Sequence, residues 1–305
     1  MNGFFNILKP GGMSSAAVVA AMRRMTGIKR VGHAGTLDPE AAGVLPIMTG
    51  KATRLFDYLT DKEKEYEAVI AFGSSTDTQD ATGSILETGE NWPDRDRLRK
   101  AADQLTGDII QVPSMYSAIK VQGEPLYKRA RKGERIDVPE RTVHIEKIEI
   151  LGEETDHGFA IRVQCGKGTY IRTLCHDLGV LCGCPAHMRS LLRTRSGLFR
   201  ISEAVSLKEA EELAGRGELA EKLLPPDYAL THLPMVHFSA EMGKMVRNGA
   251  KLPVIKSMQD LKEDQPVRVY LEQEFWGIAQ RQGNMLYWKV QIAPEEELKE
   301  KRTCE

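Results

Sequence analysis

Hydrophobic and polar residues alternate in several short segments of the chain, a pattern that is typical of half-buried β-strands. Strands are therefore predicted over residues 4–8, 66–72, 143–151 and 159–165. Helical spacing replaces this alternation after Ser14 and Ser15, either of which can cap a helix, and helices are also predicted after Pro93 and from Thr169 onward. Glycine and small polar residues dominate segments 32–46 and 73–83, which predicts loops.

Two later segments indicate how the chain is divided. Residues 112–141 combine several prolines and glycines with many charges, which predicts an exposed functional insertion. Ser206 and Glu209 form a capping-box pattern, and the proline-marked segment 224–227 that follows is the expected domain boundary. Beyond it, strands are predicted over 267–271, 275–280 and 286–292. The pattern predicts an α+β protein with a large domain, residues 1–230, and a small β-rich domain, residues 231–305.

Composition narrows the class of protein. Of the 305 residues, 41% are hydrophobic and 28% are charged, the ordinary balance of a globular protein. The apolar stretches are shorter than a membrane span and the N-terminus lacks the features of a signal peptide, so we expect no membrane association and a cytoplasmic location. The five cysteines are odd in number and clustered, which makes a poor disulfide framework.

The net charge of −1 hides an uneven distribution along the chain. Residues 115–141 hold seven Lys or Arg against four acids, and residues 187–200 hold four arginines and no acid. Residues 203–227 reverse this balance, with seven acids against three bases. The basic segments are either a phosphate-binding surface or ordinary solvated faces, and charge alone does not decide between them.

The densest chemical motif is Gly-His-Ala-Gly-Thr-Leu-Asp-Pro over residues 32–39, followed by Gly-Val-Leu-Pro over residues 43–46. Small and ring-constrained residues here fix a loop around one carboxylate, that of Asp38. An Asp-Pro turn that bonds only its own backbone is the structural alternative. A Walker-type phosphate loop is excluded because the Gly-Lys-Ser/Thr ending is missing.

Two further segments carry candidate chemistry. Gly166-Lys167-Gly168-Thr169 begins a predicted helix that contains Arg172, and backbone amides at such a position can bind a phosphate. The other is a group of cysteines and histidines over residues 175–187, which suggests zinc. Its Cys-x-Cys spacing is not the usual Cys-x2-Cys knuckle, so we expect no metal.

Five separated motifs together resemble the TruB family of bacterial tRNA pseudouridine-55 synthases, over residues 1 to about 230. They are Lys-Pro-Gly-Gly-Met-Ser-Ser at 9–15, the loop 32–46, Lys-Glu-Tyr at 64–66 leading to Thr-Asp-Thr at 76–78, Pro-Ser-Met-Tyr-Ser-Ala-Ile-Lys at 113–120, and Gly-Thr-Tyr-Ile-Arg at 168–172 with Asp-Leu-Gly at 177–179. The fourth segment in chain order, 113–120, is similar to the family's RNA-gripping thumb. The C-terminal residues resemble a PUA-like domain only loosely.

The resemblance implies the pseudouridine-synthase fold, a mixed, mainly antiparallel sheet flanked by helices with a thumb at about 112–141. It also implies a reaction that needs no cofactor. Asp38 matches the family's nucleophile and Arg172 its partner arginine. Tyr66 matches the aromatic residue that stacks on the flipped base, and its hydroxyl can also act as the base that removes a proton during the rearrangement. A carboxylate nucleophile suits the chemistry, because a transient adduct divides the breaking and remaking of the glycosidic bond into easier steps.

The resemblance also implies substrate contacts. The matching positions are His33 in the space vacated by the target base, Lys9 and Pro10 in a segment that buttresses the aromatic residue, Leu191 against the base, and Lys64, Arg193 and the basic thumb, including Lys120, at phosphates. Residues 41 and 42 are both alanine where the family often has a hydroxyl residue. The expected partner is tRNA, bound at its T loop and T stem by a monomer without guide RNA.

Three rival functions remain. A non-catalytic RNA-binding or tRNA-folding protein would use the same groove without needing Asp38, Tyr66 and Arg172. A guide-RNA-dependent relative would carry longer terminal extensions. A nucleoside glycosidase would need a second acid beside Asp38, for which Glu40 and Asp77 are the nearest options in the sequence.

Overall fold

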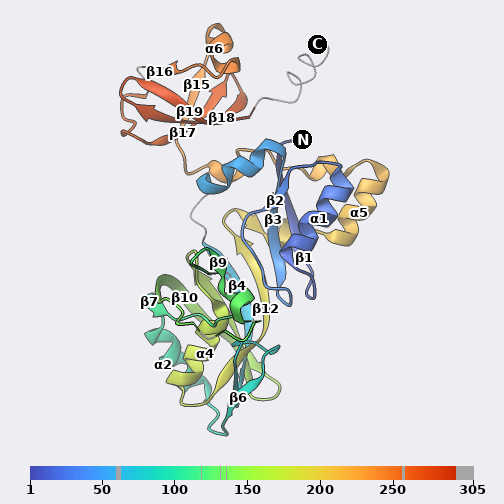
Figure 1. The fold of residues 1–305 in the computed structure, drawn as a ribbon, viewed down its shortest axis with the longest axis vertical. Helices are drawn as coiled ribbons and strands as arrows, with labels where there is room; N and C mark the ends of the chain where they lie inside the picture. The colour runs from blue at the N-terminus through green and yellow to red at the C-terminus, as the bar shows by residue number, and fades with distance from the viewer. Residues whose placement is uncertain (60–62, 118, 131, 135, 256–257, 293–305) are drawn as a thin grey trace.

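The computed structural model describes residues 1–59, 63–117, 119–130, 132–134, 136–255 and 258–292 (Figure 1). Ten strands form its main sheet: β1 (Gly3–Lys9), β2 (Val31–His33), β3 (Ala42–Thr49), β4 (Lys64–Phe72), β7 (Gly107–Gln111), β10 (Arg141–Glu154), β11 (Gly158–Cys165), β12 (Ala186–Ser196), β13 (Phe199–Arg200) and β14 (Val205–Ser206). Their order is β14-β1-β3-β12-β4-β11-β10-β7, with β2 on β3 and β13 on β12. The β1–β14 and β3–β12 pairs are parallel and the others antiparallel, which confirms the predicted mixed sheet.

Helices cover this sheet in two groups. The helices of the described chain are α1 (Ser15–Thr26), α2 (Arg95–Gln104), α3 (Leu126–Ala130), α4 (Ile171–Leu181), α5 (Leu207–Arg216) and α6 (Gly243–Arg247), and the 3-10 segments are η1 (Gly50–Tyr58), η2 (Ile201–Glu203), η3 (Leu219–Lys222), η4 (Tyr228–Leu230) and η5 (Ala240–Met242). Figure 1 shows α1 and α5 beside the part of the sheet that contains β1, and α2 and α4 beside the part that contains β10. Two separate apolar cores lie beneath these pairs. No described helix is long and apolar enough to span a bilayer.

The helix starts follow the expected capping chemistry. Ser14 caps α1 by accepting from the amide of Ala17, and Ser206 caps α5 by accepting from the amide of Glu209. Asp94 caps α2 in the same way, through the amide of Arg97. These contacts confirm the predicted starts of all three helices.

Several predicted loops contain regular structure. Segment 32–46 is a loop only at its centre, because its ends belong to β2 and β3, which pair with one another. Segment 73–83 contains β5 (Ser74–Thr76), which forms a hairpin with β6 (Ile85–Thr88). Within the predicted insertion, β8 (Lys120–Val121) and β9 (Glu124–Pro125) pair and lead into α3, whose Leu126 is buried. The prediction of loops was therefore wrong at the two ends of segment 32–46 and over Ser74–Thr76, and the predicted insertion contains short regular elements.

The C-terminal residues form a second sheet of five strands. They are β15 (Met235–Phe238), β16 (Leu252–Pro253), β17 (Pro266–Leu271), β18 (Glu274–Gln282) and β19 (Met285–Gln291), in the order β15-β17-β18-β19-β16. The last three strands in sequence were predicted and are confirmed. The two sheets are not independent, since Phe4 and Phe199 of the main sheet share an apolar core with Leu230, Ile278 and Val290.

Candidate active site

Asp38 lies in the loop between β2 and β3, residues 34–41, which we call the Asp38 loop. The buried hydroxyl of Ser15 donates to the carbonyl oxygen of Leu37 at 3.0 Å and accepts from the amide of Leu37 at 2.9 Å. Ser14 already caps the helix, so Ser15 is left to clamp the residue that precedes the candidate nucleophile. From the sequence, Ser15 was predicted only as a possible cap, and the pair of adjacent serines was the available signal for a second role.

Two completely buried cations hold the rest of the Asp38 loop. The ammonium group of Lys9 donates to the carbonyl oxygens of Pro10, Met13 and Pro39 at 2.8, 2.5 and 2.9 Å. The guanidinium of Arg193 donates to the carbonyl oxygens of Gly35, Thr36 and Val44 at 3.1, 3.3 and 2.7 Å. Every carbonyl from residue 35 to 39 thus has a donor, since that of Asp38 accepts from the amide of Ala41 at 3.2 Å.

These positions correct two of the expected substrate contacts. Arg193 cannot bind a phosphate, because its guanidinium is buried and already donates to three carbonyls. Lys9 is equally inaccessible to substrate, and burial lowers its pKa while Glu40 and Asp38 oppose that shift. Pro10 is exposed and accepts from Lys9 through its carbonyl oxygen. Lys9 and Arg193 therefore support the Asp38 loop rather than contact the substrate.

Gly43 lets β3 approach β12 closely enough for Arg193 to reach the loop. Its φ is +120°, and a Cβ at this position would lie 2.3 Å from the carbonyl oxygen of Arg193. Any larger residue would separate the two strands at the point where their parallel pairing begins. The alanines at 41 and 42 leave this arrangement intact, since Ala41 is buried and closes the turn with Asp38 through its amide.

Arg172, at the start of α4, pairs with Asp38 through two nitrogens. Its Nε lies 3.0 Å from one carboxylate oxygen and its Nη2 donates to the other at 3.5 Å. The Arg172 side chain is 7% exposed, whereas that of Asp38 is 42% exposed. The guanidinium is therefore a buried counter-charge, and the carboxylate that it orients remains open to solvent.

The other nitrogens of Arg172 contact two further segments. Nη1 donates to the carbonyl oxygen of Thr78 at 3.1 Å and lies 3.6 Å from a carboxylate oxygen of Asp80. Nη2 also donates to the carbonyl oxygen of Tyr116 at 3.2 Å. Each of the five N–H groups of the guanidinium thus faces an oxygen.

Asp80 was missed by the sequence analysis, which stopped at Thr78. One of its carboxylate oxygens accepts from the hydroxyl of Thr78 at 2.7 Å and from the amide and hydroxyl of Thr82 at 3.0 and 2.6 Å. Because those bonds and Arg172 engage both oxygens, Asp80 is not placed to protonate a leaving group as a glycosidase acid would. Asp77 is also engaged, by the amide of Ser84 and the hydroxyl of Tyr116.

The partly exposed side chain of Asp38 lines a cavity of about 170 Å³. Five residues named from the sequence line it together, namely Asp38, Tyr66, Arg172, Lys64 and Leu191. Tyr66 and Lys64 come from β4 and Leu191 from the neighbouring β12, in which Arg193 pairs with Tyr66 across the strands. Strands β4 and β12 therefore place an aromatic and an apolar side chain in the same cavity as residues of the Asp38 loop and α4.

Burial sets the protonation of the aromatic and imidazole groups nearby. It raises the pKa of Tyr66, against the opposing effect of Arg193, so the phenol stays protonated at neutral pH. This favours stacking or hydrogen-bond donation over a base role for Tyr66 in the free protein. Burial also lowers the pKa of His33, with a further contribution from Arg193. His33 lies on β2 and is not among the residues that line the cavity.

The thumb, residues 112–141, carries less free charge than its composition suggests. Arg129 lies 3.2 Å from Glu134, and Lys132 lies 3.1 Å from Glu124, so part of the basic charge is neutralised within the thumb. Lys120 is in β8 and pairs with Pro125 through its backbone. Residues 131 and 135, two of the predicted basic positions, lie outside the described part of the chain.

The cysteine cluster offers no second chemical centre. Cys165, Cys175, Cys182 and Cys184 are free and buried, and burial raises the pKa of Cys165 and Cys182 to about 11. Thiols in that state are poor nucleophiles and poor metal ligands. Among the described residues no group of three or more His, Cys, Asp or Glu is arranged to hold a metal ion.

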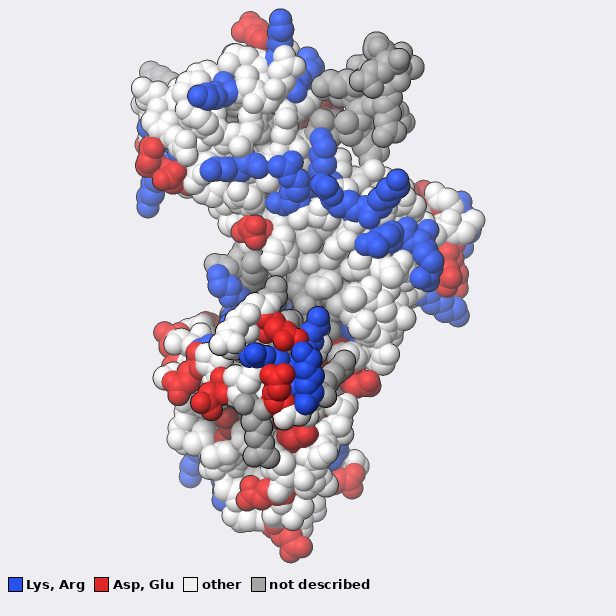
Figure 2. Space-filling view, viewed as in Figure 1, with Lys and Arg blue, Asp and Glu red and all other residues white. Residues whose placement is uncertain are grey.

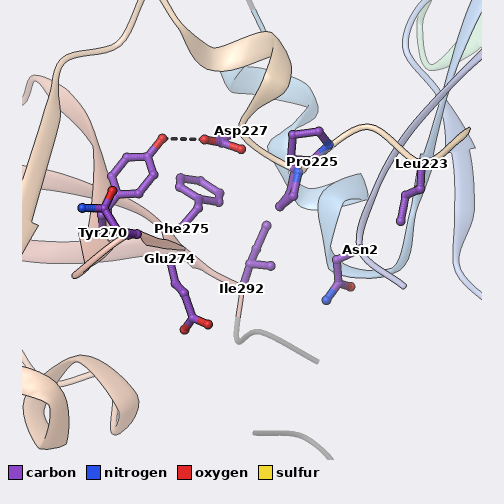
Figure 3. Close-up of a pocket in the computed structure, with 10 residues that line it drawn as sticks. Asn2, Leu223, Pro225, Asp227, Tyr270, Glu274, Phe275 and Ile292 are labelled. Carbon is purple, nitrogen blue, oxygen red and sulfur yellow. Dashed lines mark hydrogen bonds between the residues drawn. The ribbon is translucent and has the colours of Figure 1, made fainter. Parts of the chain in front are cut away.

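A larger cavity, of about 350 Å³, lies where the two sheets meet (Figure 3). Asn2 and Leu223 line it from the main domain, and Tyr270 and Phe275 from the C-terminal sheet. The hydroxyl of Tyr270 donates to the carboxylate of Asp227 at 2.5 Å, which joins the C-terminal sheet to the connecting segment. Its polar pair is thus structural, and the cavity that contains Asp38 remains the candidate active site.

Two protein-family models and several curated relatives match the sequence of this chain. The model described as "TruB family pseudouridylate synthase (N terminal domain)" matches residues 23–171, and "tRNA pseudouridylate synthase B C-terminal domain" matches residues 172–231. The chain is 43% identical to tRNA pseudouridine synthase B of Geobacillus thermodenitrificans, over 88% of this chain and 90% of that protein. The chain belongs to the TruB family of pseudouridylate synthases. Two more TruB relatives, from Bacillus subtilis and Alkaliphilus oremlandii, are 41% and 42% identical over 89% and 95% of this chain and 90% and 97% of their own lengths.

Solved structures confirm the fold. A chain of a Cbf5-Nop10-Gar1 complex matches 96% of this TruB-family chain and 86% of its own length, with a TM-score of 0.72 and 26% identity. The archaeal box H/ACA sRNP Nop10-Cbf5 complex gives the same TM-score at 25% identity, over 96% of this chain and 87% of that one. The pseudouridine-synthase fold, the additional β domain and the isomerase class predicted from the sequence are thereby confirmed.

Proposed function

We propose that this enzyme converts uridine-55 in the T loop of tRNA to pseudouridine, with Asp38 as nucleophile and without a cofactor or metal. The observation that carries this proposal is the partly exposed carboxylate of Asp38, paired with buried Arg172 at a cavity that Tyr66 also lines. The curated relatives, which match most of the chain at 41–43% identity, are all named tRNA pseudouridine synthase B.

The reaction is an isomerisation, so atoms and electrons balance without a co-reactant. The bond between N1 of uracil and C1′ of ribose breaks, a bond between C5 and C1′ forms, the proton on C5 leaves and N1 gains a proton. Asp38 supplies the nucleophilic oxygen that makes a transient adduct, and Arg172 keeps its carboxylate charged and aimed. A charged, oriented carboxylate is needed in each of the three routes, whether it attacks C1′, attacks the pyrimidine ring or assists elimination to a glycal.

The target uridine must leave the RNA stack to reach this cavity. Extrusion of a base costs a few kcal/mol, and stacking on an aromatic ring returns about 1–3 kcal/mol. Tyr66 is the ring available for that contact, and Leu191 supplies an apolar wall opposite the polar Asp38 and Arg172. Lys64 lines the same cavity, at a place where it can meet a phosphate of the flipped nucleotide.

We further propose that the enzyme acts in the cytoplasm as a monomer without guide RNA. Support comes from the difference in similarity between the two groups of relatives. Identity to the tRNA pseudouridine synthases is 41–43%, whereas identity to the chains from Cbf5 complexes is 25–26%. The rival of a purely RNA-binding protein does not account for the Asp38–Arg172 pair or for the five donors that hold the Asp38 loop.

Incubation of the purified chain with an unmodified tRNA transcript, followed by pseudouridine mapping at single-nucleotide resolution, tests the proposal. We expect one modified position, in the T loop, without added metal or cofactor. Asp38→Asn should reduce product below detection while tRNA affinity stays within a few-fold of the original protein. Undiminished product from this variant, or modification outside tRNA alone, would overturn the assignment.

A further inference from the structure

The thumb root, residues 113–117, is fastened to the loop that carries Asp80. The hydroxyl of Tyr116 donates to the carboxylate of Asp77 at 3.3 Å, and the hydroxyl of Ser114 donates to the carbonyl oxygen of Thr78 at 3.4 Å. Asp77 is itself fixed, since its other carboxylate oxygen accepts from the amide of Ser84 at 2.8 Å. The thumb therefore rests on a rigid hairpin at two side-chain contacts.

Arg172 lies at the meeting point of three segments. It donates to Asp38 in the Asp38 loop, to the carbonyl oxygen of Thr78 in the hairpin, and to the carbonyl oxygen of Tyr116 in the thumb root. One of the five acceptors of this guanidinium thus belongs to the thumb, a segment that protrudes from the main sheet. Displacement of the thumb root would leave a buried N–H of Arg172 without its acceptor.

We propose that Asp77 and Tyr116 are positioning residues, which seat the thumb root so that the carbonyl of Tyr116 fixes the guanidinium of Arg172 against Asp38. This inference rests on the proposed function for its catalytic readout. Neither residue touches the reacting atoms, because neither lines the cavity that contains Asp38.

The charges around Arg172 explain why its orientation needs this support. Asp38 and Asp80 lie on either side of the guanidinium, with closest contacts of 3.0 and 3.6 Å. A guanidinium released from the thumb carbonyl can rotate toward Asp80 and loosen its hold on Asp38. The phenol of Tyr116 is suited to a permanent donor role, since the nearby charge of Asp77 raises its pKa.

Single-turnover kinetics on tRNA separate positioning from simple RNA binding. Tyr116→Phe removes only the hydroxyl, and Asp77→Asn keeps an oxygen for the amide of Ser84. We expect each variant to lower the single-turnover rate constant about three- to tenfold, the worth of one net hydrogen bond. The tRNA dissociation constant should change less than twofold. The double variant should be no slower than the slower single variant, because both changes break the same contact.

Tyr287→Phe is the matched control, since it removes a phenol hydroxyl from β19 in the C-terminal sheet. It should leave the rate constant unchanged. The inference is overturned if Tyr116→Phe retains the original rate constant, if it weakens tRNA binding without slowing the chemical step, or if the two single effects multiply in the double variant.

Hydrogen exchange on the free enzyme tests the same contact without any reaction. The amides of Leu126 and Tyr127 donate to the carbonyl oxygens of Ile119 and Ser117 inside the thumb, at 2.8 and 3.0 Å. We expect Tyr116→Phe to speed exchange at these amides and to leave the strands of the main sheet unchanged. Unchanged thumb exchange would overturn the inference. A chain that modifies no tRNA at all would defeat the proposed function and leave this exchange result standing.

Discussion

Arg172 shows why the site needs arginine rather than any cation. Its planar group meets acceptors from Asp38, Asp80, Thr78 and Tyr116, and all five of its N–H groups are used. A lysine ammonium has three donors on a flexible stem, so it cannot hold both oxygens of Asp38 and two backbone carbonyls together.

We therefore expect Arg172→Lys to lower the single-turnover rate constant by roughly 100-fold, which corresponds to about 2.7 kcal/mol of lost charge-assisted hydrogen bonding. The tRNA dissociation constant should stay within about threefold, because the side chain is 7% exposed and faces inward. Rapid-quench measurement of tritium release from C5-labelled tRNA provides the rate constant. A rate within fivefold of the original would show that charge alone suffices at this position.

His33 supplies a prediction on pH and stability. Burial lowers its pKa, and its Nδ1 has no hydrogen-bond partner among the residues that the structure describes. Below the ordinary pKa of about 6.5 the unfolded chain binds a proton that the folded chain resists, so this residue makes unfolding easier as the pH falls from 6.5 toward its lowered value. Replacement by glutamine should remove that contribution.

Urea denaturation between pH 5 and pH 7 checks this directly. The free energy of unfolding of the original chain should fall more steeply with decreasing pH than that of His33→Gln, by at most about 1.4 kcal/mol per pH unit. His144→Gln is the control with the opposite sign, because hydrogen bonds that His144 donates to the carboxylates of Asp108 and Glu146 raise the pKa of that exposed histidine. Parallel curves for the original and His33→Gln would contradict the assignment of a buried neutral imidazole.

The sequence located some of these residues and missed others for a physical reason. Asp38, Tyr66 and Arg172 stand in recognisable motifs and meet in one cavity. Ser15 contacts Leu37, which is 22 residues further along the chain, and Asp80 contacts Arg172 on α4. Only the folded chain reveals such contacts. Arg193 was misjudged because a basic residue in a basic segment looks exposed, whereas β12 turns it into the core.

At the scale of elements, α1 combines two functions in adjacent residues. Ser14 caps the helix, and Ser15 clamps the Asp38 loop through both backbone groups of Leu37. Removal of the Ser14 hydroxyl and removal of the Ser15 hydroxyl should therefore have different effects on stability and on the rate constant. Ser14→Ala is expected to lower the free energy of unfolding by about 1 kcal/mol, with little effect on the rate constant.

Ser15→Ala is expected to lower the free energy of unfolding by about 2–3 kcal/mol, because two buried backbone groups lose their partner. It should also slow the single-turnover reaction more than Ser14→Ala does, since the residue before the nucleophile is released. Urea denaturation and single-turnover assays on the two variants together check this. Equal rate constants for the pair would mean that the clamp serves stability alone.

Strand pairing explains where the predicted elements were wrong. Segment 32–46 looks like a loop because it holds glycines and a proline, but its residues 43–46 pair with β1, in a ladder that continues to Thr49. Glycine and proline disfavour a strand locally. Here β1 pairs along one edge of β3, and β12 and β2 pair with the two ends of its other edge. Local composition cannot show that, whereas the capping serines of α1 and α5 act locally and were found.

On the scale of the whole molecule, charge is separated more strongly than the net value of −1 suggests. Figure 2 shows Lys and Arg gathered across the C-terminal domain and the adjoining part of the main domain, while acids are frequent at the opposite end. The first 37 residues contain five Lys or Arg and no acid. Apart from buried Lys9, these are the exposed residues Arg23 and Arg24 in the last turn of α1, and Lys29 and Arg30 between α1 and β2.

If tRNA is the substrate, this basic surface should bind phosphates that lie beyond the flipped nucleotide, and its loss should alter the salt dependence of binding. Neutralised phosphates release counterions, so each contact contributes roughly 0.7–0.9 to the slope of log K against log salt. Arg23→Gln combined with Arg24→Gln should therefore reduce the slope by about 1–2 and leave the single-turnover rate constant at saturating tRNA unchanged.

Lys100→Gln, on α2 in the other part of the main domain, should leave both quantities unchanged. Filter binding across 50–300 mM KCl measures the slopes. The thumb neutralises part of its own charge through Glu124 and Glu134, so it offers few free cations to phosphates. An undiminished slope in the double variant would therefore indicate that the C-terminal domain makes the main phosphate contacts.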